Sequence, residues 1–206
     1  MIVYSAQEKQ SYMKTLVTVA LLIGGTAALG FAQPKKGDAT GLDAMTKNAA
    51  SPAKETTVTI NGKKIGIWYH APSVKGRKIF GSADSLQPEG SIWRLGADNA
   101  TWLHTDAELD IHGVKVAPGD YSLYMDLDAG KWKLIVNKKT GQWGINRDGS
   151  TTRVAADDVG TAPMTMSKPP SPVEQLKITL SSAGGNKGKL QVEWENVVAS
   201  VDFTAK

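Results

Sequence analysis

The sequence contains no cysteine among its 206 residues. A chain without thiols has no disulfides, no Cys-ligated zinc site and no cysteine nucleophile, and it carries no lipidated N-terminal cysteine. The disulfide bonds that stabilise many exported domains are therefore missing, so apolar packing must stabilise this fold. Export is not excluded, because many exported proteins fold without disulfides.

A strong charge of one sign is also lacking. The formal net charge is +4, from 24 Lys and Arg against 20 Asp and Glu, and the basic residues are spread along the chain. A nucleic-acid-binding surface needs clustered Lys and Arg. We therefore expect no nucleic-acid partner, and we interpret the mild excess as a solvated surface.

Residues 14–32 show the three parts of a secretory signal peptide. Lys14 precedes an apolar run from Leu16 to Leu29, and Gly30-Phe31-Ala32 has the small-x-small pattern that signal peptidases accept. We predict cleavage after Ala32. The mature protein is then periplasmic or secreted, and it contacts the membrane only while the signal peptide is attached.

An uncleaved membrane anchor is the alternative interpretation of this segment. A spanning helix needs about 20 apolar residues, and this run is shorter and contains Gly24-Gly25. The alternative is therefore less favoured. The polar stretch before Met13 adds nothing to the signal, so Met13 is a candidate for the true initiator.

The remainder divides into a leader and one domain. Residues 33–54 are rich in small and polar residues without apolar periodicity, which predicts a flexible leader. From Glu55 onward the pattern changes to period two, and no later stretch has the period of a long amphipathic helix. We therefore predict a single domain over residues 55–206.

The clearest unit of that domain is a hairpin. Apolar residues alternate over 121–127 and over 132–136, with Asp128-Ala129-Gly130 between them. This pattern predicts two antiparallel strands with one face buried and the other exposed to solvent. Similar alternation flanks three further turn sequences, and a last strand is expected at Val201 and Phe203; the turns are Asn61-Gly62, His112-Gly113 and Gly184-Gly185-Asn186.

These strands predict an all-β fold. Roughly eight to ten short strands at this spacing are typical of a sandwich or barrel. One sheet cannot bury its apolar face alone, so a second sheet must pack against it. We predict an antiparallel β-sandwich, and the pattern leaves jelly-roll and fibronectin-like topologies both open.

Two segments of this domain carry a family resemblance. They are YHAPSVKGRKIFG at 69–81 and WRLGADNAT at 93–101, and PGDYSL at 118–123 and Trp143-Gly144 follow in the same order. Together they resemble the secreted bacterial family known as domain of unknown function 2911 (DUF2911), over about residues 55–204. The resemblance implies an exported β-rich domain and supplies no reaction.

The chain departs from that family's pattern at two places. Family members commonly have Tyr-Ser-Arg-Pro where this chain has Tyr69-His70-Ala71-Pro72, so an arginine is missing. They commonly have a glutamate at the position of Asn99. If that arginine and glutamate served a shared site, this chain has an altered one.

Basic residues give the first candidate site. Lys75, Arg77 and Lys78 surround Gly76, and together with Arg94 they could hold a carboxylate or phosphate. The spacing is not that of a phosphate-binding loop. The alternative is a solvated turn plus a structural Arg94 paired with Asp98.

Tryptophan gives the second candidate. Trp132 and Trp194 fit the inward phase of their strands and are expected in the core. Trp143 lies in a glycine-rich loop, where it could stack on a sugar ring or a partner. The alternative is a plug over the edge of the core.

Metal and nucleophile signals are weak. The three histidines could ligate a metal together with Asp98 or Asp110, but no two of the histidines have ligand spacing in the sequence, so we predict no metal site and no cofactor. No nucleophile elbow appears, and no pair of carboxylates stands out for glycoside hydrolysis. The residues concerned are His70, His104 and His112; Ser73, Ser82 and Ser91; and Glu89, Asp98 and Asp106.

These observations favour a non-enzymatic binding or structural domain of the cell envelope, with a small molecule, a glycan or a protein as its ligand. The alternative is an envelope hydrolase with its site within residues 69–101, in which Arg94 stabilises a developing anion and Asp98 assists. No catalytic residue can be assigned. The candidate binding residues are Tyr69, Arg77, Arg94, Asp98 and Trp143.

Overall fold

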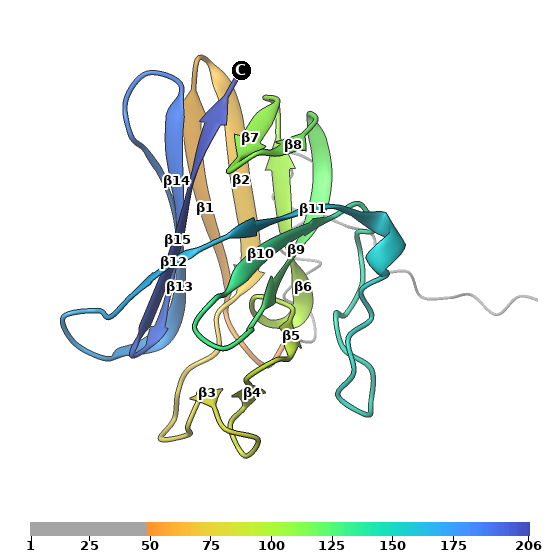
Figure 1. The fold of residues 1–206 in the computed structure, drawn as a ribbon, viewed down its shortest axis with the longest axis vertical. Helices are drawn as coiled ribbons and strands as arrows, with labels where there is room; N and C mark the ends of the chain where they lie inside the picture. Colours follow the sequence, from red (N-terminus) through yellow and green to blue (C-terminus); the bar gives the residue numbers. More distant parts are fainter. Residues whose placement is uncertain (1–48) are drawn as a thin grey trace, which may run out of the picture. The chain divides into compact units, whose positions relative to one another are not determined.

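The computed structural model describes residues 49–206, which form two antiparallel β-sheets packed face to face (Figure 1). The predicted all-β fold with antiparallel sheets is confirmed. The predicted signal peptide, its cleavage site, the Met13 start and residues 33–48 of the leader lie outside the described residues. The first strand begins at Ala53, so the last two residues assigned to the leader belong to a strand.

The first sheet has the order β1-β2-β6-β9-β10-β11, with β5 also paired to β9. Its strands are β1 (Ala53–Ile60), β2 (Lys63–His70), β5 (Ile92–Trp93), β6 (Ala97–Thr105), β9 (Gly119–Asp126), β10 (Lys133–Asn137) and β11 (Asp158–Pro163). The second sheet has the order β13-β14-β15-β7-β8, with β12 also paired to β15. Its strands are β7 (Leu109–Ile111), β8 (Val114–Val116), β12 (Thr165–Ser167), β13 (Val173–Ser182), β14 (Lys187–Glu195) and β15 (Val197–Ala205).

Two small elements lie outside these sheets. The strands β3 (Phe80–Gly81) and β4 (Gln87–Pro88) form a separate parallel pair. A 3₁₀-helix, η1, covers Ala155–Asp157. Within residues 49–206, no helix has the length and apolarity that a membrane span requires.

Local turn chemistry explains the predicted hairpins. Asn61 and Gly62 both have positive φ, 50° and 74°, and they join β1 to β2 with Ile60 opposite Lys63. Asparagine and glycine tolerate this backbone region, which suits the twist of the flanking strands. The His112-Gly113 turn joins β7 to β8 in the same way.

The outer face of the β9–β10 hairpin differs from the prediction. Tyr124 and Ile135 point away from the main core, yet they are fully buried and form a second apolar cluster with Ala100. The segment after β10 covers them: Gln142 donates its side-chain amide to the Tyr124 hydroxyl, and the Ala100 amide donates to the Gln142 carbonyl. The expectation of a solvent-exposed second face was therefore wrong here.

Side chains from the first sheet bind the edge of the second. The Tyr69 hydroxyl accepts the Ile178 amide at 3.0 Å, and the Thr56 hydroxyl accepts the Leu180 amide at 3.0 Å. Both amides belong to the edge strand β13, whose N–H groups, if left unpaired, could pair with a strand of another chain. At the other side, β11 and β12 pass from the first sheet to the second (Figure 1).

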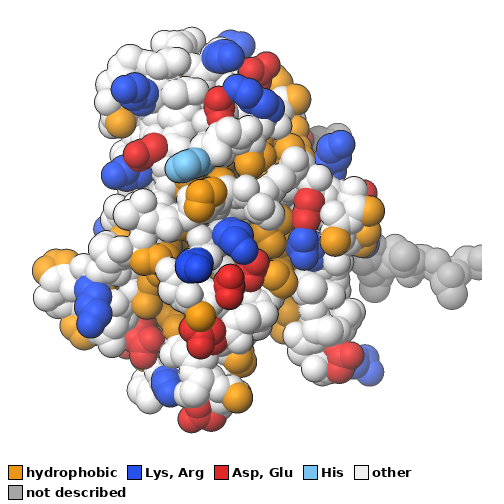
Figure 2. All heavy atoms as spheres, in the orientation of Figure 1, with side chains coloured by type: hydrophobic (Ala, Val, Ile, Leu, Met, Phe, Trp, Pro, Cys, Tyr) orange, Lys and Arg blue, Asp and Glu red, His pale blue; other side chains and the backbone are white. Residues whose placement is uncertain are grey.

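Charges of both signs are intermixed over the face of the domain seen in Figure 2. Lysines of the described residues pair with carboxylates, as in Lys115–Asp110 and Lys133–Asp126. The loops that follow β2, β5 and β10 gather at the end of the sandwich opposite the C-terminus (Figure 1). That end holds the candidate site.

Candidate functional site

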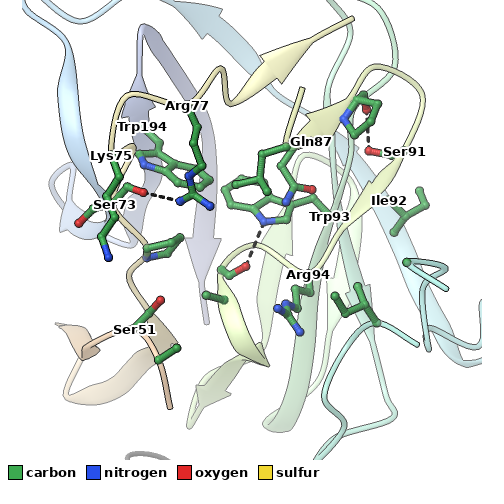
Figure 3. A pocket seen from close by; sticks show the side chains of 18 residues that line it. Ser51, Ser73, Lys75, Arg77, Gln87, Ser91, Ile92, Trp93, Arg94 and Trp194 are labelled. Atoms are coloured by element: carbon green, nitrogen blue, oxygen red, sulfur yellow. Dashed lines mark hydrogen bonds between the residues drawn. The ribbon is translucent and has the colours of Figure 1, made fainter. Parts of the chain in front are cut away.

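A cavity of about 570 Å³ opens at this end of the sandwich (Figure 3). Its volume lies in the range of small-molecule sites. The walls come from the segment before β1, the loop after β2, the β4–β6 region, the loop after β10 and the end of β14. The lining residues are Ala50, Ser51, Pro72, Ser73, Lys75, Arg77, Leu86, Gln87, Pro88, Ser91, Ile92, Trp93, Arg94, Gly96, Ala97, Ile145, Gly149 and Trp194.

The basic loop is a tight turn that presents Lys75 and Arg77 to this cavity. Lys75 and Gly76 have positive φ, 50° and 69°, and the Arg77 amide donates to the Val74 carbonyl at 3.0 Å. The Arg77 guanidinium donates from Nε to the Val74 carbonyl at 3.1 Å and from Nη2 to the Ser73 carbonyl at 2.6 Å. The turn therefore fixes the Arg77 side chain against its own backbone.

Arg94 follows β5 and joins two loops. Its Nη1 donates to the Trp143 carbonyl at 2.9 Å, and the guanidinium lies 5.4 Å from the centre of the Trp143 ring. This stacking adds a cation–π attraction to the hydrogen bond. Gly144 packs so closely that a Cβ there would lie 2.8 Å from two Arg94 carbons.

The electrostatic surroundings of Arg94 are those of a half-buried cation. Burial lowers the pKa of Arg94, while the charges of Asp98 and Tyr124 act in the opposite direction. A guanidinium remains charged in proteins. Because the surroundings are less polar than water, its attraction for an anion is stronger than at a fully exposed position.

Asp98 does not pair with Arg94. Its two carboxylate oxygens accept the backbone amides of Ala50 and Ser51 at 3.2 and 3.0 Å, and Asp98 is buried with a φ of 56°. No ion pair joins it to Arg94 in the part of the chain that the structure describes. The structural pairing considered from the sequence is therefore not formed, and Asp98 instead fixes one wall of the cavity.

Aromatic rings form the floor. Trp93 and Trp194 stack at 5.6 Å between ring centres, and Phe80 meets both edge-on. The Trp93 indole donates to the Gly96 carbonyl at 3.1 Å. Trp194 Nε1 is buried and has no hydrogen-bond partner within residues 49–206.

The remaining candidates from the sequence fall in different places. Tyr69 lies in the core, where burial raises the pKa of its hydroxyl and the Ile178 amide opposes that rise. Trp143 is 43% exposed and lies under Arg94 beside the cavity. The structure thus places Arg77 and Arg94 in the lining, Trp143 beside the cavity, Asp98 behind the lining and Tyr69 away from it.

The histidines and serines form no shared centre. His104 bonds Asp120 at 2.6 Å and Asp106 at 3.3 Å, and His112 occupies the β7–β8 turn. Over residues 49–206, no group of three or more His, Asp or Glu is placed to hold a metal ion. Ser91 lines the cavity and donates its hydroxyl to the Pro88 carbonyl at 2.6 Å.

Sequence reasoning missed the floor. Trp194 was expected in the core, and it is 1% exposed, but it also lines the cavity from the end of β14. An inward side chain near the end of a sandwich strand contacts both the core and the cavity at that end, so the position of Trp194 in its strand could have predicted its place in the cavity. Nothing in the sequence around Ala50 and Ser51 indicated that these residues would form a wall of the cavity.

The lining has one electrostatic character. Three cations, Lys75, Arg77 and Arg94, face the cavity, and none of the described residues that line it is Asp or Glu. Glu174 lies outside the lining, where it accepts the Lys75 backbone amide at 3.0 Å. A cavity with basic groups over an apolar aromatic floor suits an anion that carries an apolar body.

A comparison with curated proteins found no match, and neither did a comparison with solved structures. A family model described as "Protein of unknown function (DUF2911)" matches residues 51–203. The match covers both sheets except for the last two residues of β15, and it covers every residue that lines the cavity except Ala50. The chain therefore belongs to the DUF2911 family of proteins of unknown function.

Proposed function

We propose that this protein is an exported binding domain of the cell envelope, and that its loop cavity holds a small organic anion with an apolar body. The observation that carries the binding role is the lining: three cations and no carboxylate above the Trp93 and Trp194 rings. Export rests on the signal-peptide pattern of residues 14–32.

Two of the three cations, Arg77 and Arg94, are held in place before a ligand arrives. Arg77 is bound to two carbonyls of its own turn, and Arg94 is bound to the Trp143 carbonyl and stacked on its ring. Each guanidinium has five N–H donors, so both retain donors for a carboxylate or phosphate. A side chain that is already ordered loses less entropy on binding, which favours affinity.

Binding is better supported than hydrolysis. The lining supplies the hydroxyls of Ser51, Ser73 and Ser91, but among its described residues it has no His, Asp or Glu to act as a general base. Asp98, which the hydrolase alternative needs, has both oxygens committed to backbone amides. That alternative lacks the group that would move a proton.

The test compares an anion with its neutral counterpart. Benzoate and benzamide have the same ring and nearly the same shape, so isothermal titration of the purified full-length protein with each isolates the effect of charge. We expect benzoate to bind more tightly, and Arg94→Gln to weaken it about tenfold or more, since a hydrogen bond to a charged group contributes roughly 1.5–3 kcal/mol.

Arg147→Gln is the matched control. Arg147 is exposed and belongs to the same loop as Trp143, but it does not line the cavity. The substitution removes one positive charge from the same end of the domain, so it should leave benzoate affinity nearly unchanged. Equal binding of benzamide and benzoate, or a benzoate affinity that falls no further in Arg94→Gln and in Arg77→Gln than in Arg147→Gln, would contradict the proposed function.

A further inference from the structure

The cations of the cavity form two separate groups. Lys75 and Arg77 come from the turn after β2, whereas Arg94 comes from the connection between β5 and β6. In Figure 3, Lys75 and Arg77 lie at one side of the cavity and Arg94 at another, with the Trp93 indole between them. One compact anionic group on Arg94 would therefore leave the Lys75–Arg77 side unused.

The first group has donors to spare. Arg77 uses Nε and Nη2 on the Val74 and Ser73 carbonyls, which leaves its other N–H groups without a partner in the described residues. The Lys75 ammonium forms no ion pair within residues 49–206. This side can therefore bind an acidic group without breaking an existing side-chain ion pair.

Trp194 adds an aromatic ring on the same side of the cavity (Figure 3). Its Nε1 is buried without a partner in the part of the chain that the structure describes, whereas Trp93 Nε1 donates to the Gly96 carbonyl. Because the Trp194 N–H is buried, Trp194 offers its ring, and not its N–H, to a ligand beside Lys75 and Arg77.

The second group is independent of the first. Arg94 is fixed by the Trp143 carbonyl and ring and by the close approach of Gly144, none of which belongs to the turn after β2. Between the groups lies the Trp93 ring, with the Gln87 side chain next to it (Figure 3). The cavity thus has two basic ends separated by the Trp93 ring.

We propose that the ligand is a dianion whose two acidic groups are separated by an apolar spacer, with one group bound by Lys75 and Arg77 and the other by Arg94. This inference rests on the proposed function and specifies the class of anion that the cavity binds. Dicarboxylates and phosphorylated carboxylic acids share this chemistry. A single acidic group can occupy only one end, so it forfeits the contacts of the other.

The test is a length series measured by isothermal titration on the purified full-length protein. Linear α,ω-dicarboxylates of four to ten carbons are compared with monocarboxylates of equal length. We expect diacid affinity to peak at one length and to exceed that of the matching monoacid about tenfold or more, the effect of one additional charged hydrogen bond.

Substitutions assign the two ends. Arg94→Gln and Arg77→Gln should each reduce diacid affinity at the optimal length to about that of the monoacid, while Arg147→Gln should not. Circular dichroism and thermal melting confirm that each variant is folded. Phenyl phosphate distinguishes two separated charges from one doubly charged group, which needs only one end.

The outcomes separate this inference from the proposed function. Diacids that bind no more tightly than monoacids at any length would overturn the two-ended site and leave anion binding intact. Phenyl phosphate that binds more tightly than every diacid, with no loss in one of the two variants, would overturn it as well. Failure of every anion to bind would overturn both proposals.

Discussion

The substitution Tyr69→Phe tests whether Tyr69, a candidate binding residue from the sequence, stabilises the fold or binds a ligand. The Tyr69 hydroxyl is buried between the sheets and accepts the Ile178 amide at 3.0 Å. Its removal leaves a buried N–H unpaired, at a cost of about 1–3 kcal/mol. For a domain of this size, 1 kcal/mol shifts Tm by roughly 2–4 °C, so we expect Tm to fall by roughly 2–12 °C.

The assay is thermal unfolding followed by circular dichroism, with benzoate titration on the same samples. Tyr121→Phe is the control, because the Tyr121 hydroxyl donates to the Ala117 carbonyl at 2.9 Å and its loss leaves an acceptor instead of a donor. A carbonyl that lacks one partner is tolerated better than an N–H that lacks its only one. An unchanged Tm in Tyr69→Phe, or a loss of benzoate affinity at constant stability, would refute this reasoning.

Three further predictions concern the Arg94 loop, pH and processing. In urea unfolding, Gly144→Ala should destabilise the domain by about 1–3 kcal/mol, and it should weaken benzoate binding, because a side chain at φ +95° is strained and its Cβ would press on Arg94. Gly184→Ala is the control for backbone strain alone, since Gly184 has a φ of +90° with open space around it. Burial raises the pKa of Tyr69 and Tyr124 above the ordinary value of 10.0, so these hydroxyls ionise at lower pH in the unfolded chain than in the folded one. The free energy of unfolding should therefore fall as the pH rises above about 10. Replacement of both residues by Phe should flatten that fall in urea titrations between pH 8 and 11, and an unaltered slope would contradict the prediction. N-terminal sequencing of protein recovered from the periplasm or medium should begin at Gln33, and recovery of chains that retain Leu16 would exclude the predicted cleavage.

Local patterns predicted the hairpins because turn chemistry and alternation act within a few residues. Asn61-Gly62 and His112-Gly113 have the positive φ values that these residues tolerate, and the flanking strands pair as expected. The pairing of β2 with β6 and of β7 with β15 joins strands that are not consecutive, so it also needs tertiary contacts. The β11–β12 crossing escaped prediction because Asp158–Pro163 has no regular alternation of apolar and polar residues.

The outer face of β9 shows how tertiary context overrides a strand pattern. Ser122 and Tyr124 have the polar phase of an exposed face, yet both are fully buried. Gln142, in the segment after β10, binds the Tyr124 hydroxyl and accepts the Ala100 amide. A pattern of period two records which face is apolar, but it does not record whether a loop far along the chain covers the other face.

The candidate site was only partly predictable for the same reason. Arg77 and Arg94 stood out as loop cations in the segments that carry the family resemblance, and both line the cavity. Asp98 was expected to act on Arg94 or on a ligand, but its carboxylate binds the Ala50 and Ser51 amides, nearly fifty residues away in sequence. No pattern in the sequence links those residues, because the contact exists only after the sheets have formed.

The central claim is that organic anions bind over Trp93 and Trp194, and indole N–H signals in a ¹⁵N–¹H correlation spectrum test it most directly. The chain has six tryptophans, so each indole can be assigned from single Trp→Phe variants. We predict that benzoate shifts the signals of Trp93 and Trp194 far more than benzamide does. Trp68 and Trp102, which stack on each other outside the main core cluster, should keep their positions. Shifts confined to Trp68 and Trp102, or equal shifts with benzoate and benzamide, would contradict the account.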